Sequence, residues 1–321
     1  MISNQELQDV YRGLVEDAIG NQFVGIDPYD FASSGLRFPS FLLSKISFLN
    51  KVCPIDVRPV LGISPSENSK SNALFMQAFA NFEGNEYSKS IDYLNDWFER
   101  NRSKEFEEFS VGFAFEMALA RYSSGPGKTS LIITLFTVFA FIDLYKKTGC
   151  KDVLNKITSF EELLERHWLK FETEDQLWYS YLPEQKDEVF NATAKVGRFY
   201  AALYGVDENP KHLDKIRKIL TYLQRVQNPD GTWPYSTKVK YVDGFHTAFV
   251  LEAVYEMKSV LGNSDYDQMF VSGLDNYTNS MFIEGRSLHF HPEHRPKDVR
   301  SAILRTEIRD AANAIILFSK I

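Results

Sequence analysis

The sequence contains few cysteines: only Cys53 and Cys150 occur among its 321 residues. Two cysteines cannot form the disulfide framework that stabilises small secreted domains. A chain of this length can instead bury a large hydrophobic core. The composition therefore predicts a reducing, cytoplasmic compartment, and no motif in the sequence indicates a bound cofactor.

Positive charge is also scarce. The 36 Lys and Arg residues are outnumbered by 43 Asp and Glu residues, which gives a formal net charge of −7 at pH 7. Proteins that bind nucleic acid need a basic surface to neutralise the phosphates. The charge balance therefore argues against nucleic acid as a partner.

Long hydrophobic runs are missing. The most apolar run, residues 131–144, is about 14 residues long and includes Thr134, Thr137 and Asp143. A helix needs roughly 20 apolar residues to span a bilayer, so this run is interpreted as a buried helix. Residues 1–21 are polar and acidic, without the pattern of a signal peptide. We expect no membrane insertion.

The chain does contain a repeat of helical hairpins. Each repeat begins with an apolar helix, turns at glycine or asparagine, and continues with a more charged helix. The apolar helices are expected at 72–82, 130–147, 192–204 and 247–261, and their partners at 87–100, 160–171, 212–226 and 266–282. The apolar helices thus begin about 55 to 62 residues apart.

This period predicts the fold class. A hairpin cannot bury its apolar face alone and must stack on its neighbours. Open solenoids of short repeats have periods of about 34 to 47 residues, so the longer period favours a closed ring. We predict an all-α fold, an (α/α) toroid or incomplete α/α barrel of about five to six hairpins. One domain is expected over 1–321, with an irregular N-terminal cap at 1–70 and hairpin repeats at 71–321.

Residues 227–235 (QNPDGTWPY) end one helix and place two aromatic side chains. Proline stops the helix, and Trp233 and Tyr235 follow on extended backbone with their side chains on the same face. Trp233 either stacks on a sugar or braces neighbouring hairpins, and the brace is favoured because the tight turn directs it back at the ring. Tyr235 is the better ligand contact, and its phenol is a candidate acid or base beside a cationic neighbour.

Residues 243–247 (DGFHT) begin the next apolar helix. The Asp243 carboxylate can orient the His246 imidazole as a general base near neutral pH. The alternative is that Asp243 caps the helix while His246 packs into the ring. We predict His246, Asp243 and Tyr235 as the catalytic residues if the protein is an enzyme.

Other polar residues are predicted to bind substrate. Asn191 opens the third apolar helix, where it either caps that helix or donates to a sugar carboxylate. Asp30 and Arg58 either line a cleft or pin loops in the irregular section. The remaining candidates for substrate binding are Glu116, His291 and Arg300.

The only histidine cluster is His289, His291 and His294. A zinc site needs three or four ligands at suitable spacing, and no cysteine or paired His–Glu helix motif lies near these histidines. We interpret the cluster as a polar loop at the rim of the cleft, and no metal is predicted.

Several motifs, in order along 25–304, resemble those of a known family. They are 27–30 (DPYD), 54–63 (PIDVRPVLGI), 189–192 (VFNA), 227–235 and 243–247. The sequence resembles bacterial (α/α) toroid proteins encoded with capsular and exopolysaccharide biosynthesis enzymes, some of them similar to uronic-acid C5-epimerase domains. The Gln-x-x-Asp-Gly-x-Trp element is also similar to a structural brace of triterpene cyclases and protein prenyltransferases.

The resemblance implies a carbohydrate-active protein of surface-polysaccharide biosynthesis. Its partner would be an anionic sugar or oligosaccharide, and it would associate with enzymes of that pathway. Epimerase- or lyase-type proton abstraction fits best, with Asn191 and Arg58 or Arg300 holding the substrate carboxylate. Hydrolysis needs two carboxylates at a set distance, which the sequence does not identify.

Two other functions remain open. Gly244 stands where the family has asparagine, Arg300 stands where it has histidine, and 116–120 keeps only the acid of a longer element. These departures favour a non-catalytic sugar-binding or scaffold subunit. A third possibility is an isoprenoid-handling toroid related to cyclases and prenyltransferases. The absence of an aspartate-rich Asp-Asp-x-x-Asp motif counts against it.

Overall fold

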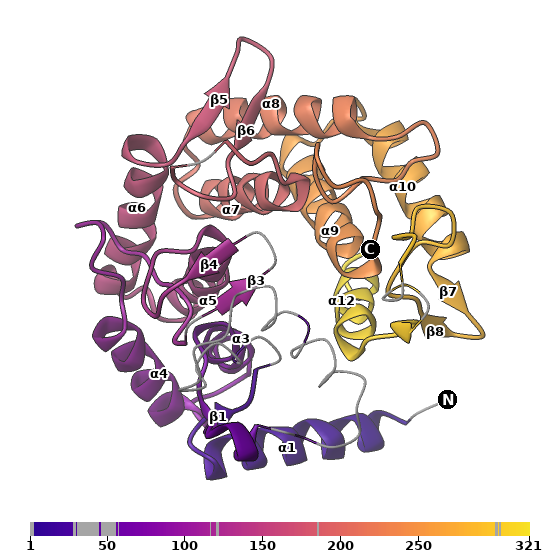
Figure 1. Cartoon of the computed structure of the whole chain (residues 1–321). Helices are drawn as coiled ribbons and strands as arrows, with labels where there is room; N and C mark the ends of the chain where they lie inside the picture. The colour runs from indigo at the N-terminus through magenta and orange to yellow at the C-terminus, as the bar shows by residue number, and fades with distance from the viewer. Residues whose placement is uncertain are drawn as a thin grey trace. The chain divides into compact units, whose positions relative to one another are not determined.

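The computed structural model describes residues 3–27, 30, 45, 56, 58–115, 117–119, 122–184, 186–298, 301 and 303–321. Its internal contacts fall into two compact units, Met1–Leu163 and Leu164–Ile321, here called the N-terminal and C-terminal units. Each unit is built largely of helices (Figure 1). The single domain expected over 1–321 stays a prediction.

The N-terminal unit contains the first two predicted hairpins. Helix α3 packs against both α4 and α5. The elements are α1 (Asn4–Gly20), β1 (Val24–Gly25), η2 (Pro59–Leu61), β2 (Ser66–Glu67), α3 (Ser69–Ala80), α4 (Ser88–Arg100), β3 (Met117–Leu119), β4 (Tyr122–Ser124), α5 (Leu131–Thr148) and α6 (Lys151–Arg166), the last of which continues into the C-terminal unit.

Local sequence explains the limits of α5. The Ser130 side chain accepts a hydrogen bond from the Ile133 amide and caps the first turn. Gly149 has φ 64°, a left-handed conformation that glycine adopts without steric penalty, and so ends the helix. Most of α5 is buried, as predicted for the apolar run. None of the described helices is both long and apolar enough to cross a membrane.

The partner of α5 differs from its predicted bounds of 160–171. Helix α6 already begins at Lys151, directly after the turn at Gly149, and ends at Arg166. Residues Lys170–Glu172 form β5, which pairs antiparallel with β6 (Leu177–Tyr179). The charged and apolar residues of 151–159 lie on opposite faces of an amphipathic helix. Such alternation is harder to recognise in the sequence than the continuous apolar run of α5, so the start of α6 was predicted too late.

The C-terminal unit contains the third and fourth hairpins and a final helix. Helix α7 packs against α8 and α9, and α9 also packs against α12, so α9 lies between α7 and α12 (Figure 1). The remaining elements are α7 (Phe190–Asp207), α8 (Pro210–Val226), α9 (Gly244–Leu261), α10 (Asp267–Ser280), β7 (Phe282–Ile283), β8 (Arg286–Ser287) and α12 (Ile308–Phe318).

Close packing of α7 on α9 depends on a glycine. A Cβ atom at Gly197 would lie 2.4 Å from the Met257 sulfur and 2.9 Å from a methyl group of Ile219. The missing side chain therefore lets three helices approach one another. The candidate site lies at the starts of α7 and α9.

Candidate functional site

The start of α9 holds the predicted aspartate–histidine pair. Asp243 is 3% exposed and occupies the N-cap position of α9. Its Oδ1 accepts a hydrogen bond from the His246 amide at 2.8 Å. The same carboxylate lies 2.7 and 2.9 Å from His246 Nδ1. Asp243 therefore caps the helix and orients the imidazole at once, so the two interpretations of the sequence are compatible.

The pairing determines which nitrogen of His246 is available. A carboxylate accepts, so Nδ1 is the nitrogen that carries a proton, and Nε2 is the nitrogen whose lone pair becomes available when the ring is neutral. The His246 side chain is 29% exposed, and Nε2 has no hydrogen-bond partner within the described part of the chain. Burial alone would raise the pKa of Asp243, but the charge and hydrogen bonds of His246 outweigh it and hold that pKa below its usual value.

Tyr235 lies against this histidine. The Tyr235 and His246 rings pack edge-to-face with centroids 4.9 Å apart, and the Tyr235 and Tyr241 rings lie 5.6 Å apart. The Tyr235 amide donates to the Tyr241 carbonyl at 2.9 Å, and the Phe190 amide donates to the Tyr235 carbonyl at 3.3 Å. The aromatic loop is therefore tied to the start of α7.

Asn191 is the second residue of α7 and is 5% exposed. Its Nδ2 is buried and lacks a hydrogen-bond partner among the described residues. The N-cap position belongs to Val189, so the alternative in which Asn191 caps the helix is wrong. A buried amide without a partner is costly unless a ligand or water accepts from it.

A buried lysine lies one turn beyond Asn191. Lys195 is 1% exposed, and its Nζ lies 3.5 Å from the centroid of the Phe249 ring. Positions four apart share one face of a helix, so Asn191 and Lys195 present an amide and a cation along the same side of α7. The sequence analysis missed Lys195, because a lysine inside a helical pattern is usually a solvent-exposed residue.

Trp233 is buried rather than available to a sugar. It is 3% exposed, and its Nε1 donates to the Leu223 carbonyl at 2.9 Å. A Cβ atom at Gly273 would lie 2.5 Å from the indole ring, so α10 packs directly over it. These contacts support the favoured interpretation of Trp233 as a brace between hairpins. They do not support the alternative in which Trp233 stacks on a sugar.

Asp30 and Arg58 belong to the N-terminal unit and are bonded to each other. Arg58 Nε lies 3.1 Å from Asp30 Oδ1, and both side chains are buried. The same guanidinium bonds Asp56 at 3.2 Å and the Asp27 carbonyl at 3.3 Å. This pattern supports the loop-pinning alternative. Glu116 and Arg300 lie outside the described residues.

The histidine cluster divides into two groups. His291 is 3% exposed, and its ring lies 4.8 Å from that of His294. Burial lowers the pKa of His291, and the nearby His294 lowers it further. His294 Nε2 lies 2.5 Å from Asp230 Oδ2. His291 was expected at an accessible rim and is instead buried, because its backbone pairs with Val242 in front of α9.

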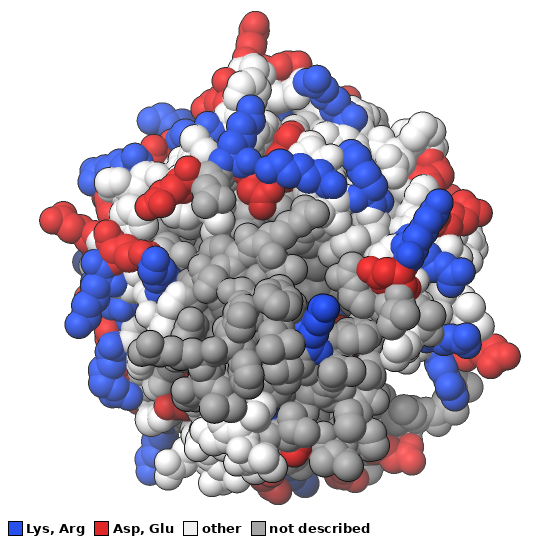
Figure 2. Space-filling model, in the orientation of Figure 1, with Lys and Arg blue, Asp and Glu red and all other residues white. Residues whose placement is uncertain are grey.

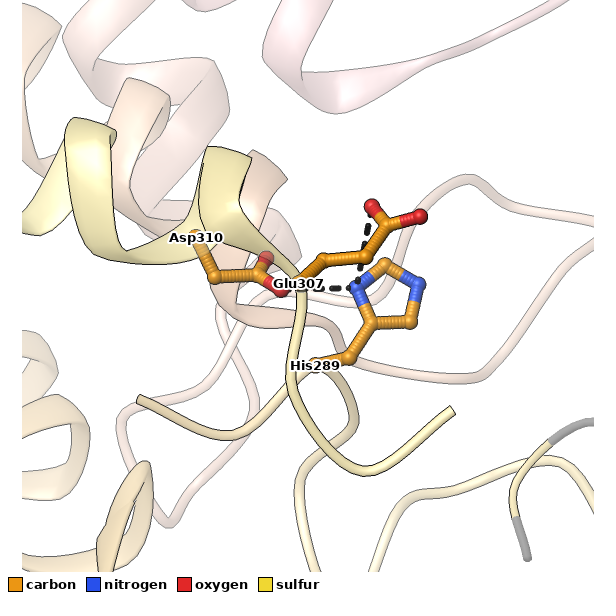
Figure 3. Close-up of side chains that lie close together, drawn as sticks. All are labelled: His289, Glu307 and Asp310. Carbon is orange, nitrogen blue, oxygen red and sulfur yellow. Dashed lines mark hydrogen bonds and ion pairs between the residues drawn. The ribbon is translucent and has the colours of Figure 1, made fainter. Parts of the chain in front are cut away.

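His289 forms the second group with two carboxylates that the sequence analysis missed (Figure 3). His289 Nδ1 lies 3.0 Å from Asp310 Oδ2 and 3.9 Å from Glu307 Oε2. Burial raises the pKa of Asp310 even though His289 opposes that shift. Burial would lower the pKa of His289, but Asp310 and the nearby Asp243 and Glu307 raise it overall.

A cavity of about 380 Å³ lies beside the same aromatic loop. It is lined by Asn228, Pro229, Asp230, Pro234, Lys240 and His294. The Asp230–His294 pair forms part of its wall. Pro234, which precedes Tyr235 in the sequence, links this cavity to the aromatic loop.

Comparison with known proteins gives the fold class. No family model and no curated protein matches the sequence. Among solved structures, cellobiose 2-epimerase from Bacillus thermoamylovorans is similar, with a TM-score of 0.61 and 10% identity over 81% of this chain and 74% of that one. A possible member of glycoside hydrolase family 105 from Salmonella enterica has a TM-score of 0.59 and 10% identity over 99% of this chain and 94% of that one.

A family 76 mannosidase from Bacteroides thetaiotaomicron is similar as well, with a TM-score of 0.55 and 11% identity over 83% of this chain and 74% of that one. The fold is an all-α (α/α) toroid. Identities this low show the fold and not the activity. The repeat period therefore predicted the fold class correctly.

Proposed function

We propose that this protein is a carbohydrate-active enzyme that abstracts a proton from a carbon atom of an anionic sugar or oligosaccharide. His246 is the general base, Asp243 positions it, and Tyr235 provides an aromatic wall. The observation that carries the proposal is the bonding of the buried Asp243 carboxylate to His246 Nδ1, with Nε2 left at a partly exposed edge.

The geometry suits proton abstraction. Nε2 accepts the proton, the ring becomes an imidazolium, and the Asp243 carboxylate stabilises the new positive charge through Nδ1. Asp243 also holds the ring in one orientation through the helix cap. A base that is fixed in place loses less entropy on reaching the transition state.

Asn191 and Lys195 provide the contacts for an anionic group. The Asn191 amide is a buried donor that has no hydrogen-bond partner among the described residues, and the Lys195 ammonium lies on the same face of α7. In a sugar acid, a donor on the carboxylate stabilises the enolate-like charge that forms when the adjacent carbon loses its proton. Acidic and basic side chains are interspersed on the face drawn in Figure 2, so attraction of an anion rests on these local groups and not on a basic surface.

The fold supports a sugar substrate. Similar structures are named as cellobiose 2-epimerases and mannosidases, and epimerisation inverts one carbon centre, which proton removal and return achieves. Hydrolysis is less favoured, since it needs two carboxylates roughly 5 to 10 Å apart across the sugar. Asp243 is buried and bonded to His246, so it is a poor member of such a pair.

The biological setting belongs to the proposal as well. The motif resemblance supports a role in surface-polysaccharide biosynthesis, in association with enzymes of that pathway, and the scarcity of cysteine supports a cytoplasmic location. Sugar binding without catalysis is the alternative, which the departures from the family motifs favour.

The test is hydrogen exchange. The protein is incubated in deuterated water with uronic-acid oligosaccharides, and with cellobiose as a neutral comparison, and NMR follows deuterium incorporation next to the carboxylate. Exchange that is lost in His246→Ala but kept in His167→Ala, a histidine of the same unit that no prediction assigns to the site, supports the proposal. Chemical-shift changes without exchange would establish a binding protein instead. The absence of both exchange and shift changes would reject a sugar-acid substrate.

A further inference from the structure

We propose that His289, Glu307 and Asp310 form a binding site for a divalent transition-metal ion such as Zn²⁺ or Mn²⁺. The site does not depend on the proton abstraction proposed above. Each residue offers one ligand atom, and the three atoms lie within 4.8 Å of one another. Figure 3 shows the imidazole of His289 facing both carboxylates.

Two of the three separations between ligand atoms match a coordination sphere, and all three lie within 4.8 Å. His289 Nδ1 lies 3.0 Å from Asp310 Oδ2 and 3.9 Å from Glu307 Oε2. Atoms bound at about 2.0 to 2.2 Å from one metal ion lie roughly 3 to 4 Å apart. In the metal-free protein a proton on Nδ1 occupies the position between His289 and Asp310, and the ion replaces that proton.

Two buried polar atoms, one in the cluster and one near it, have no hydrogen-bond partner among the described residues, which supports a bound ligand. Asp310 is 0% exposed, and its Oδ1 lacks a hydrogen bond within the described residues. The Tyr277 hydroxyl, from α10, is likewise buried without one. Burial raises the pKa of Tyr277, and the negative charges of Asp310 and Asp243 raise it further. The hydroxyl therefore lies near both carboxylates.

The negative charge of the region also favours a cation. Asp310, Glu307 and Asp243 are three carboxylates that all act on His289. His246 is bonded to Asp243, and Arg309 pairs with Glu307. A divalent ion would stabilise the buried Asp310 carboxylate far better than one shared proton does.

The ligand types select the class of metal. Imidazole nitrogen suits zinc or iron and carboxylate oxygen suits manganese, whereas calcium and magnesium prefer oxygen ligands alone. Asp310 supplies a buried anchor, and the His289 and Glu307 side chains are each 14% exposed, so the ion can enter past them. Three protein ligands leave at least one position open to water or to a substrate oxygen.

The site is joined to the start of α9. The Gly244 amide donates to the His289 carbonyl at 2.9 Å, and a Cβ atom at Gly244 would lie 3.5 Å from Asp310 Oδ1 and 2.7 Å from the Leu288 carbonyl. A side chain at Gly244, where the family motif has asparagine, would therefore clash with the Leu288 carbonyl, so glycine lets the chain before His289 pack against the start of α9.

The experiment measures metal binding directly. The full-length protein is stripped with a chelator, and titration calorimetry with Zn²⁺ and with Mn²⁺ is followed by elemental analysis after dialysis. We expect one ion per chain. We also expect at least tenfold weaker metal binding in both His289→Gln and Asp310→Asn. Loss of an outer-shell partner already lowers metal affinity by about tenfold or more, and loss of a direct ligand should lower it further. His294→Gln is the matched control, because this histidine lies on the same loop and outside the cluster.

Co²⁺ gives a second measurement that is independent of stability. A His289 ligand should produce visible d–d absorption in the wild-type protein that His289→Gln alters and His294→Gln leaves unchanged. His289→Gln keeps the proposal testable if Asp310→Asn does not fold. The proposal is overturned if the wild-type protein takes up no stoichiometric ion, if His289→Gln binds as tightly as wild type, or if only His294→Gln loses the ion.

Discussion

Two of the aspartate–histidine pairs in the C-terminal unit share a buried aspartate and differ in how it is bonded. In the first, Asp243 is buried, caps the start of α9, and leaves His246 partly exposed. In the second, Asp310 is buried, one of its oxygens has no hydrogen-bond partner among the described residues, and His289 is shared with Glu307. The fully bonded carboxylate holds a base in place. The incompletely bonded carboxylate is suited to a ligand.

The two pairs also differ in electrostatics. Bonding to His246 lowers the pKa of Asp243, whereas burial raises that of Asp310. The neighbours differ: the charge of His246 and hydrogen bonds from its imidazole and amide lower the pKa of Asp243, whereas the charges of Asp243 and Glu307 add to burial in raising that of Asp310. Four changes test this contrast.

The largest effect is expected from His246→Ala. Removing a positioned general base lowers the rate by about 10²- to 10⁴-fold, which the deuterium-exchange assay measures. The thermal midpoint should change little, because the His246 side chain is partly exposed and the Asp243 cap remains. Full exchange activity in a folded variant would rule out His246 as the base.

Asp243→Ala and Asp243→Asn separate the two roles of this residue. The alanine variant loses the cap and should reduce the free energy of unfolding by about 0.5 to 2 kcal/mol. The asparagine variant can still accept from the His246 amide and should retain most of that stability. Both variants should show much slower exchange, because neither stabilises an imidazolium. Chemical denaturation measures the first effect, and equal destabilisation by both would contradict the assignment of the cap.

Asn191→Ala should affect binding more than stability. The Nδ2 atom has no partner in the described structure, so its removal leaves no broken hydrogen bond in the free protein. The loss of one hydrogen bond to a charged group weakens binding by about 1.5 to 3 kcal/mol, which is roughly a 10- to 100-fold increase in KM or Kd for the sugar acid. Cellobiose, which carries no carboxylate, serves as the control. An equal loss with cellobiose would show that Asn191 does not read the carboxylate.

The smallest effect is in the pH dependence of stability. The pKa of Asp243 in the folded protein lies below its unfolded value. The pair therefore contributes stability above the unfolded pKa of about 3.9, and this stability is lost as pH falls through the folded pKa. Unfolding measured between about pH 6 and pH 3 should decline less steeply in Asp243→Asn than in wild type. Parallel curves would show that Asp243 is not stabilised by His246.

Much of the fold was accessible from the sequence. The apolar runs and their glycine stops marked α5, α7 and α9, because helix formation and termination depend on neighbouring residues. The start of α6 was misplaced, since an amphipathic outer helix lacks a continuous apolar run. The small β-hairpins and α12 were not predicted, because their strands are only two or three residues long and α12 follows an irregular loop.

The candidate site was accessible only in part. Asp243 and His246 were identified because they lie three residues apart at a helix start. Lys195 was missed, His291 is buried where a substrate contact was expected, and Trp233 is buried in keeping with the favoured brace. Burial of an individual polar or aromatic residue depends on the packing of other elements, which a local pattern does not contain.

The sequence by itself determined the repeated hairpins and the Asp243–His246 pair, because the residues involved are neighbours along the chain and one turn of helix brings them together. Only the tertiary structure decided that His289 meets Asp310, which is 21 residues away, and that Asn191 opens α7 beside the Tyr235 carbonyl. Contacts of this kind depend on where packed helices end and on the paths of the loops between them. The interactions that set those paths come from the whole core.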